Sequence, residues 1–548
     1  MNAKSIILSI IVLSLSLAAC SQPTPAAPVM RAQATRSAPA QPTPMWISPG
    51  PTQAPMPTSA PAAIGAAPAT SAPLPIGGAP VPTAAPAWPV PYATPPVDNT
   101  FRDYGVNPYV ETYQDHLSTF ALDVDTASYT VARRYVQEGN LPPADAIRVE
   151  EFVNFFKQDY ALPSNVAFGL YADGAPSPFY HDGSYLLRFG VQGYAVPEAQ
   201  RKPLNLTFVI DVSGSMEEQG RLEMVKQSLT MLVDRLRPVD TVAIVAYTTD
   251  AWVELNPTSG ANRTAILNAI YSLQPLNTTN VEAGLRLGYQ LAAQIYRADA
   301  TNRVILCSDG VANVGNTDPS AILEFVHGYT DEGITLTSVG VGMGNFNDVL
   351  LEQLADKGDG NYTYVDNLQE AQRALVDNMV STLQVIALDA KVQVDFNSEV
   401  VQRYRLIGYE NRAVADSDFR NNAVEAGGLG AGHAATALYA VQLKPGGTGR
   451  LATMQLRWQD PDTRQITEIN GNVNTWDLAQ SFESASPWYQ LDVVVMQYAE
   501  ILRRSPWAEG CSLREVARYA SRLPELIPND PDVAEFAQLA ARAARMAQ

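Results

Sequence analysis

The sequence has few cysteines and histidines, and this scarcity excludes several kinds of site. Three cysteines, Cys20, Cys307 and Cys511, occur in 548 residues, and no two of them stand at metal-ligand spacing. Neither a disulfide framework nor a zinc site is therefore predicted. The four histidines are far apart along the chain, and no His-Glu-x-x-His motif is present. Cys307 lies in the apolar run 304–307 and is predicted to be a small buried core residue.

Positive charge is also scarce. The chain has 37 lysines and arginines against 56 aspartates and glutamates, which gives a formal net charge of -19. Because a strongly acidic chain is repelled by a phosphate backbone, nucleic acid is excluded as a partner. The sequence contains neither a P-loop nor a Gly-x-Ser-x-Gly nucleophile elbow. With 46% hydrophobic residues, the length predicts two or three domains with sizeable cores.

The sequence has no apolar run of 18 or more residues, so no membrane-spanning helix is predicted. The apolar stretch 6–17 follows Lys4 and is typical of the h-region of a signal peptide. It ends in Leu17-Ala18-Ala19-Cys20, which resembles a bacterial lipobox. The resemblance implies that residues 1–20 are a lipoprotein signal and that Cys20 becomes a diacylated N-terminus anchored in a membrane outside the cytoplasm. The alternative is an ordinary cleaved signal with a chance cysteine.

Residues 21–99 differ in composition from the rest of the chain. They consist mainly of Pro, Ala, Thr and Ser, and their charged residues are Arg31, Arg36 and Asp98. Such a segment cannot bury enough apolar surface to fold. Fully extended at about 3.1 Å per residue it would approach roughly 240 Å, whereas a flexible coil would span only about 50 Å. We expect a linker that holds the folded part away from the membrane.

Strands and helices alternate in residues 203–385. The apolar segments 206–210, 242–246 and 303–308 are predicted strands, with predicted helices between them, such as 221–236. This alternation is typical of a parallel sheet that is covered by helices on both faces. We therefore predict a doubly wound, Rossmann-like α/β domain.

Strand-like segments occur on both sides of this domain. The N-terminal region 100–202 contains the predicted strands 117–124, 167–172 and 185–192 and the predicted helices 126–139, with Asp125 as N-cap, and 147–158. The C-terminal region 386–548 contains the predicted strands 391–396, 404–407, 437–441 and 451–456 and then helices over 491–547. Since the termini of a domain commonly lie close together, we predict that the α/β domain is inserted in one β-rich domain with N- and C-terminal helical segments.

The clearest local motif follows the first strand of the α/β domain. Asp211-Val212-Ser213-Gly214-Ser215 lies between an apolar strand and a helix, where sites form in open α/β sheets. The glycine permits a tight turn, so the two serine hydroxyls can point to one place. Asp309 follows a later strand in the same way, and Thr279 precedes a predicted helix. We expect these side chains to converge at one edge of the sheet.

Two carboxylates and three hydroxyls form an all-oxygen ligand set, which suits a hard cation. Few ligands and room for water favour Mg²⁺, with Mn²⁺ or Ca²⁺ as alternatives. Asp211 and Asp309 together cancel the charge of a divalent ion, so a third carboxylate would meet no excess negative charge. A protein partner that offers an acidic residue is the expected ligand.

The Asp-x-Ser-x-Ser motif after the first strand resembles the metal-ion-dependent adhesion site of von Willebrand factor type A domains. This resemblance implies a non-catalytic role in adhesion or scaffolding, with five metal ligands. Carried over position by position, these ligands are Asp211, Ser213, Ser215, Thr279 and Asp309. The family usually has glycines before the threonine, where this chain has Leu276-Asn277, so Thr278 stays an alternative ligand to Thr279.

The flanking sequence resembles a narrower group, the bacterial YfbK-like proteins that carry this domain. Residues 117–129 resemble their N-terminal block, and residues 430–433 with 436–439 resemble their C-terminal block. The resemblance covers the chain from Leu117 onward.

Two further functions compete with binding. The sequence Asp123-Val124-Asp125-Thr126 follows a strand and matches the Asp-x-Asp-x-Thr pattern of aspartyl phosphatases, although a structural turn also explains it. A phosphatase would need a general base or a basic phosphate clamp, and the sequence indicates neither. A structural or channel-associated role is the third hypothesis, and the lack of spanning segments argues against a pore.

Overall fold

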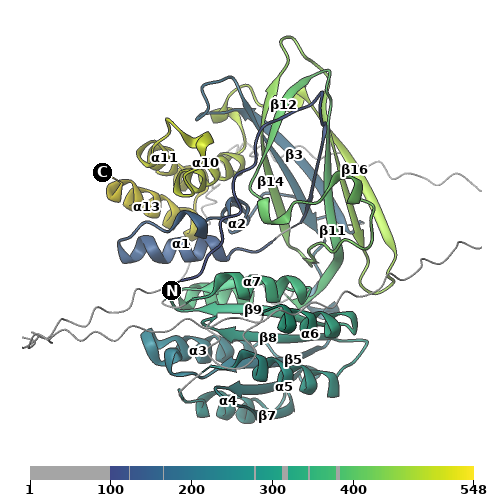
Figure 1. The fold of residues 1–548 in the computed structure, drawn as a ribbon, viewed down its shortest axis with the longest axis vertical. Helices are drawn as coiled ribbons and strands as arrows, with labels where there is room; N and C mark the ends of the chain where they lie inside the picture. The colour runs from purple at the N-terminus through teal and green to yellow at the C-terminus, as the bar shows by residue number, and fades with distance from the viewer. Residues whose placement is uncertain are drawn as a thin grey trace, which may run out of the picture. The chain divides into compact units, whose positions relative to one another are not determined.

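The computed structural model describes residues 99–122, 124–164, 166–276, 279–310, 319–343, 346–377 and 383–547. Cys20, residues 21–98 of the predicted linker and Asp123 lie outside these residues. The described chain contains a helix-covered parallel sheet and a larger part with two antiparallel sheets and a group of helices (Figure 1). None of its helices is both long enough and apolar enough to cross a bilayer.

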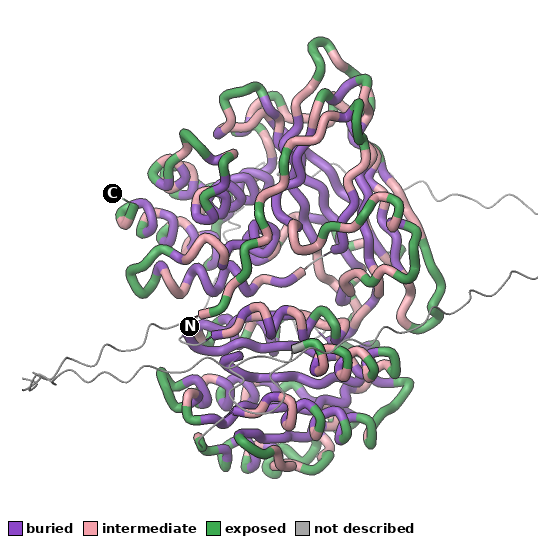
Figure 2. The backbone as a smooth tube through the Cα atoms, in the orientation of Figure 1, coloured by how far each residue is buried: buried purple, intermediate pink, exposed green. Residues whose placement is uncertain are grey.

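A six-stranded sheet forms the centre of the α/β domain. The strands run in the order β10-β9-β8-β5-β6-β7, and all neighbours are parallel except the pair β6-β7. The strands are β5 (Leu204–Asp211), β6 (Thr241–Tyr247), β7 (Ala251–Ser259), β8 (Thr301–Ser308), β9 (Ile334–Val341) and β10 (Tyr362–Val365). All eight residues of β5 are buried, as the tube in Figure 2 shows for the central strands.

Helices cover both faces of this sheet. One face packs against α3 (Arg221–Val233), α4 (Arg263–Ser272) and α8 (Leu368–Gln372). The other face packs against α5 (Val281–Gln294), α6 (Pro319–Asp331) and α7 (Asp348–Lys357). The prediction of a doubly wound α/β domain is therefore confirmed. Cys307 is buried in its core, where burial raises the pKa of the thiol to about 12.

The second part of the chain is built on two antiparallel sheets. The first has the strand order β1-β12-β14-β4-β3, and the second β13-β11-β15-β16, with β2 paired to β11. The strands are β1 (Val110–Glu111), β2 (Leu117–Ala121), β3 (Phe168–Pro176), β4 (Tyr185–Gly193), β11 (Val385–Phe396), β12 (Val401–Ile407), β13 (Leu429–Gly430), β14 (Ala434–Leu443), β15 (Arg450–Gln459) and β16 (Ile466–Asn474).

Helices form a third layer on the first of these sheets, as Figure 1 shows. In β14, Tyr439 and Val441 face the other sheet, whereas Leu438 and Ala440 face the helices. The strand is therefore buried on both faces and apolar from Ala437 to Val441. The helices are α1 (Ala127–Glu138), α2 (Val149–Asn154), α10 (Pro487–Leu502), α11 (Leu513–Ala520), α12 (Leu523–Leu526) and α13 (Pro531–Met546).

Strands from both sides of the α/β domain share these two sheets. β4 pairs with β14, β1 with β12 and β2 with β11. Because each pair joins a strand before the α/β domain to a strand after it, the α/β domain is inserted in a β-rich host domain, as predicted.

Several local predictions are wrong. Asp125 is not the N-cap of α1, which begins after Thr126. Its carboxylate instead accepts a hydrogen bond from Tyr362 N at 2.8 Å and pairs with Arg412 at 3.2 Å. α2 ends at Asn154, and the aromatic residues that follow it stay buried outside the helix. The edge strands β7 and β16 were not predicted, because most of their residues are only partly buried or exposed.

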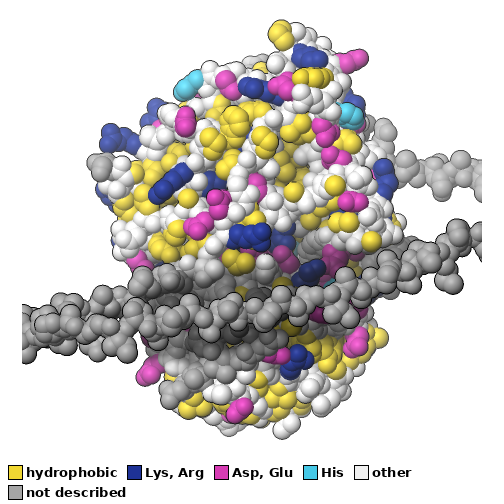
Figure 3. Space-filling view, viewed as in Figure 1, with side chains coloured by type: hydrophobic (Ala, Val, Ile, Leu, Met, Phe, Trp, Pro, Cys, Tyr) yellow, Lys and Arg dark blue, Asp and Glu magenta, His cyan; other side chains and the backbone are white. Residues whose placement is uncertain are grey.

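Buried ion pairs join the α/β domain to its host. Arg148 at the start of α2 binds Asp348 of α7 at 2.7 Å and also pairs with Glu151. Arg133 of α1 binds Asp366 at 2.6 Å. The side chains in these pairs are at most 4% exposed. On the face seen in Figure 3, by contrast, acidic and basic side chains are interspersed at the surface.

We predict that Arg148→Met lowers the free energy of unfolding by about 3–5 kcal/mol, because two carboxylates would lose their buried partner. Arg134→Met is the matched control, since Arg134 pairs with Glu138 at 2.5 Å at the surface and such pairs contribute about 1 kcal/mol or less. Urea denaturation of both variants measures the difference. Equal losses in the two variants would contradict a stabilising role for the buried pairs.

Candidate metal centre

The end of β5 places Asp211 at the carboxyl edge of the parallel sheet. Asp211 is the last residue of this strand and is fully buried. Its Oδ1 accepts a hydrogen bond from Ser213 N at 2.9 Å. Its Oδ2 accepts one from Ser308 Oγ at 2.9 Å and one from Tyr247 OH at 3.3 Å. The carboxylate is therefore held in a fixed orientation by groups from the two neighbouring strands, β6 and β8, and from the loop after β5.

The loop after β5 brings the two serine hydroxyls together. Ser213 Oγ and Ser215 Oγ are 3.1 Å apart, as their spacing predicts. Ser213 is buried and Ser215 half-buried, so this pair reaches from the interior toward solvent. A short 3-10 helix, Gly214–Gly220, continues the loop, and Gln219 and Gly220 take left-handed φ values of 52° and 70° before α3 begins. The turn in the chain lies there, several residues after the glycine of the motif.

Asp309 follows the adjacent strand β8 and is also fully buried. Burial and the negative charge of Asp309 raise the pKa of Asp211 to about 7. The two carboxylates therefore interact, as expected from strands that lie side by side. Two buried carboxylates that interact in this way leave an excess of negative charge at this edge of the sheet.

Thr279 lies on the loop that precedes α5 and is buried. This loop is held against the motif loop, because Leu276 N donates to Val212 O at 2.6 Å. Asn280 is the N-cap of α5 and also donates through Nδ2 to Thr249 O at 3.1 Å. Thr278 lies outside the described residues, so the assignment of Thr279 over Thr278 stays a prediction.

Arg221 is a site residue that the sequence did not reveal. Its guanidinium is buried, and Nη1 donates to Asp309 Oδ2 at 2.9 Å and to Ser215 O at 3.0 Å. Nη2 donates to Met343 O at 2.5 Å, in the loop after β9. An arginine at the start of an amphipathic helix is usually exposed, so no signal in the sequence distinguishes this one. Ser308 was missed as well, although it directly precedes Asp309.

The residues present fit a divalent cation. The described chain contains no group of three or more histidine, cysteine, aspartate or glutamate side chains that could hold a metal ion, so a site here depends on hydroxyls. Carboxylate and hydroxyl oxygens are ligands for hard cations such as Mg²⁺. The mutual repulsion of Asp211 and Asp309 is the electrostatic reason for a cation at this place.

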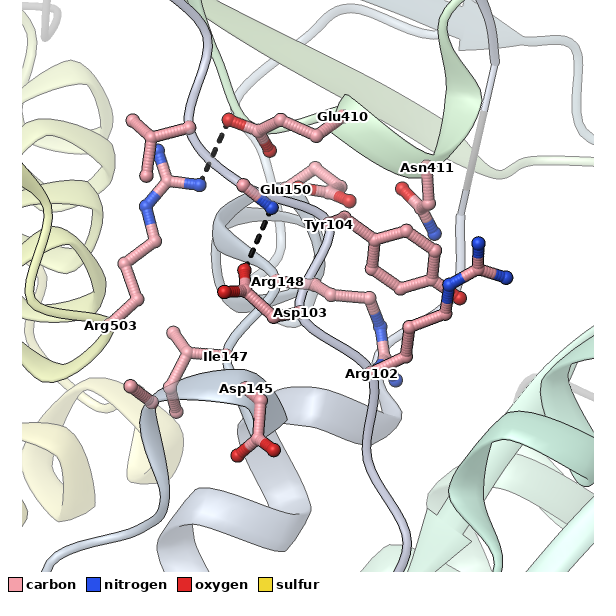
Figure 4. A pocket seen from close by; sticks show the side chains of 13 residues that line it. Arg102, Asp103, Tyr104, Asp145, Ile147, Arg148, Glu150, Glu410, Asn411 and Arg503 are labelled. Atoms are coloured by element: carbon pink, nitrogen blue, oxygen red, sulfur yellow. Dashed lines mark hydrogen bonds and ion pairs between the residues drawn. The ribbon is translucent and has the colours of Figure 1, made fainter.

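Two cavities, one in the host and one between the host and the inserted domain, are lined by other residues. One, of about 60 Å³, lies between residues 102–106, the start of α2 and Arg503 (Figure 4). Ion pairs occupy its walls, including Arg503 with Glu410 at 3.0 Å. The other, of about 750 Å³, lies where α2, α8 and the loop around His433 meet.

Three family profiles match the chain. The profile described as "von Willebrand factor type A domain" matches residues 205–378. The profile "Uncharacterized protein YfbK, C-terminal" matches residues 381–546, and the profile "von Willebrand factor" matches residues 95–188. The matched regions correspond to the inserted domain and to parts of the host on either side of it.

Individual proteins also match the chain. The chain is 34% identical over 449 residues to YfbK of Escherichia coli strain K12, which covers 77% of each chain. It is also 34% identical over 185 residues to sll0103 of Synechocystis, which covers 34% of this chain and 43% of the relative. A solved structure, von Willebrand factor type A from Catenulispora acidiphila, has 15% identity and a TM-score of 0.41 and covers 70% of this chain and 89% of its own. The identity and coverage of the first match show that this chain belongs to the YfbK family of proteins with a von Willebrand factor type A domain.

Proposed function

We propose that the chain is a cell-envelope lipoprotein that binds a protein partner through Mg²⁺ at Asp211, Ser213, Ser215, Thr279 and Asp309, without catalysing a reaction. The observation that carries this proposal is the pair of buried carboxylates at the ends of β5 and β8, with the two serine hydroxyls 3.1 Å apart beside them. A divalent cation at this edge would offset the repulsion and leave a position for a ligand from outside.

The surroundings of the site support a protein ligand. Leu276, on the loop bonded to Val212, is 50% exposed. An exposed leucine beside a polar centre is a suitable apolar contact for a partner, because buried apolar area adds to the affinity of an interface. Glu218 of the motif loop is exposed as well, so we infer a partner surface with an acidic residue for the metal and neutral or basic residues around it.

Catalysis is the weaker alternative. Two of the four histidines pair with carboxylates elsewhere, His116 with Asp395 and His327 with Glu425. His433 is on a loop of the host, and burial lowers its pKa to about 4. Arg221 is the cation beside Asp309, but its Nη1 and Nη2 donate to Asp309, Glu218 and two backbone carbonyls. A phosphatase would need such a cation aimed at a bound phosphate.

Asp211→Asn is expected to weaken Mg²⁺ binding roughly 100-fold, because it removes one of two buried negative charges next to the ion. Asp250→Asn is the matched control, since Asp250 is an exposed carboxylate on the neighbouring β6-β7 turn. Isothermal titration of Mg²⁺ into the folded proteins measures both affinities. Equal affinities in wild type and Asp211→Asn would exclude this site.

The raised pKa of Asp211 predicts a pH dependence in metal-free protein. Its pKa is about 7 in the fold against 3.8 as the reference value, so between these values the folded chain binds a proton that the unfolded chain does not. Stability contributed by this group is therefore present at low pH and falls as pH rises toward 7. Denaturation of wild type and Asp211→Asn at pH 5 and pH 8 in chelator compares the two. The variant should lose less stability over this interval, and identical slopes would contradict the raised pKa.

We further propose that the protein is anchored outside the cytoplasm through a lipid on Cys20. The support is the lipobox-like sequence that ends at Cys20. Cys20→Ser is expected to move the protein from the membrane fraction to the soluble fraction, because the acyl chains supply the anchoring energy. Fractionation of cells that express the two forms tests this, with Cys511→Ser as the control. Retention of Cys20→Ser in the membrane would contradict lipid anchoring.

A further inference from the structure

Arg221 ties together three loops at the carboxyl edge of the parallel sheet. It contacts Asp309 after β8, the carbonyl of Ser215 after β5 and the carbonyl of Met343 after β9. Its side chain is 1% exposed, and its pair with Asp309 is fully buried. Glu218 approaches Nη2 at 3.5 Å but is 68% exposed, so water screens its charge. Arg221 therefore places a buried positive charge against Asp309, one of the two carboxylates.

The fold makes room for this guanidinium. Gly342, directly before Met343, has φ +77°, and a Cβ atom there would lie 2.0 Å from Arg221 Nε. Any residue with a side chain at this position would push the arginine out of its place. The position of Arg221 thus depends on the loop after β9 as well as on Asp309.

The charge balance of the site changes when Arg221 is counted. Asp211 and Asp309 alone would neutralise a divalent ion. With one carboxylate already paired to Arg221, the same ion leaves the buried site with one net positive charge. An uncompensated buried charge is costly, and one monovalent anion from a partner would neutralise it. A second anionic ligand would again leave the site unbalanced.

We propose that Arg221 is a specificity-determining residue of the metal centre: its buried charge makes the Mg²⁺-loaded site require one singly charged carboxylate as its last ligand. This inference rests on the proposed function, since it concerns the same site. Loss of the Arg221 charge is expected to change the affinity for the metal and the affinity for the carboxylate in opposite directions. Removing the charge strengthens binding of the metal and weakens binding of the carboxylate, whereas loss of a purely structural contact weakens both.

The test uses Arg221→Gln, Arg221→Lys and, as matched control, Lys226→Gln. Lys226 lies on the same helix and pairs with the exposed Glu223 at 2.8 Å, so its loss removes an equal charge away from Asp309. Mn²⁺ affinity is measured by titration calorimetry. Acetate is then titrated into the Mn²⁺-loaded proteins, and its binding is followed by the loss of metal-bound water in solvent proton relaxation.

In Arg221→Gln, we expect Mn²⁺ to bind about tenfold tighter and acetate about tenfold weaker than in wild type. Arg221→Lys and Lys226→Gln should stay within about threefold of wild type in both. Weaker Mn²⁺ binding, or unchanged acetate binding, in a folded Arg221→Gln overturns the proposal. If Arg221→Gln does not fold, the test depends on Arg221→Lys, which keeps the charge. Loss of acetate binding in Arg221→Lys then overturns the proposal. Absence of Mn²⁺ binding in wild type would instead refute the proposed function.

Discussion

Two buried carboxylates of like charge, at the ends of adjacent parallel strands, impose the main constraint on this protein. Asp211 and Asp309 reach the same edge of the sheet because β5 and β8 pair in parallel. Two negative charges buried away from water destabilise the fold unless hydrogen bonds or a positive charge compensate them. The hydrogen bonds to Asp211 and the ion pair of Asp309 are partial compensation. The loops around the two carboxylates supply these groups, and a bound cation would complete the charge compensation.

The host domain fixes the inserted domain through charge rather than through an apolar interface alone. Arg133 and Arg148 come from the host helices and reach acidic residues of the inserted domain. A buried arginine that binds carboxylates in a defined geometry permits one docking position, because a shifted position would leave charges unpaired. The segment after the linker adds a second connection: Thr100 N donates to Phe346 O at 2.7 Å, in the loop next to Gly310. The first described residues thus lie close to the candidate metal centre.

The sequence predicted the parts of the structure whose signal is local. Continuous apolar runs predicted β5 and β8, and the motif between β5 and α3 predicted the meeting of Ser213 and Ser215. Edge strands such as β16 were missed, because only their inner neighbours are buried on both faces. Asp125 was misassigned for another reason. A carboxylate before a helix is typical of an N-cap, but its partners Tyr362 and Arg412 are more than 230 residues away in the sequence.

The same distinction applies to the metal centre. The proposed ligands follow strands or precede a helix, so their positions in the sequence predict that they lie at the carboxyl edge of the sheet. Arg221 differs, because its role depends on contacts with Asp309 and Met343, 88 and 122 residues further along the chain. A motif can identify the atoms that would hold an ion, but the net charge of the site comes from the whole buried neighbourhood. For that reason the motif indicates oxygen ligands that suit a hard cation, whereas the proposed charge of a last ligand depends on the fold around Arg221.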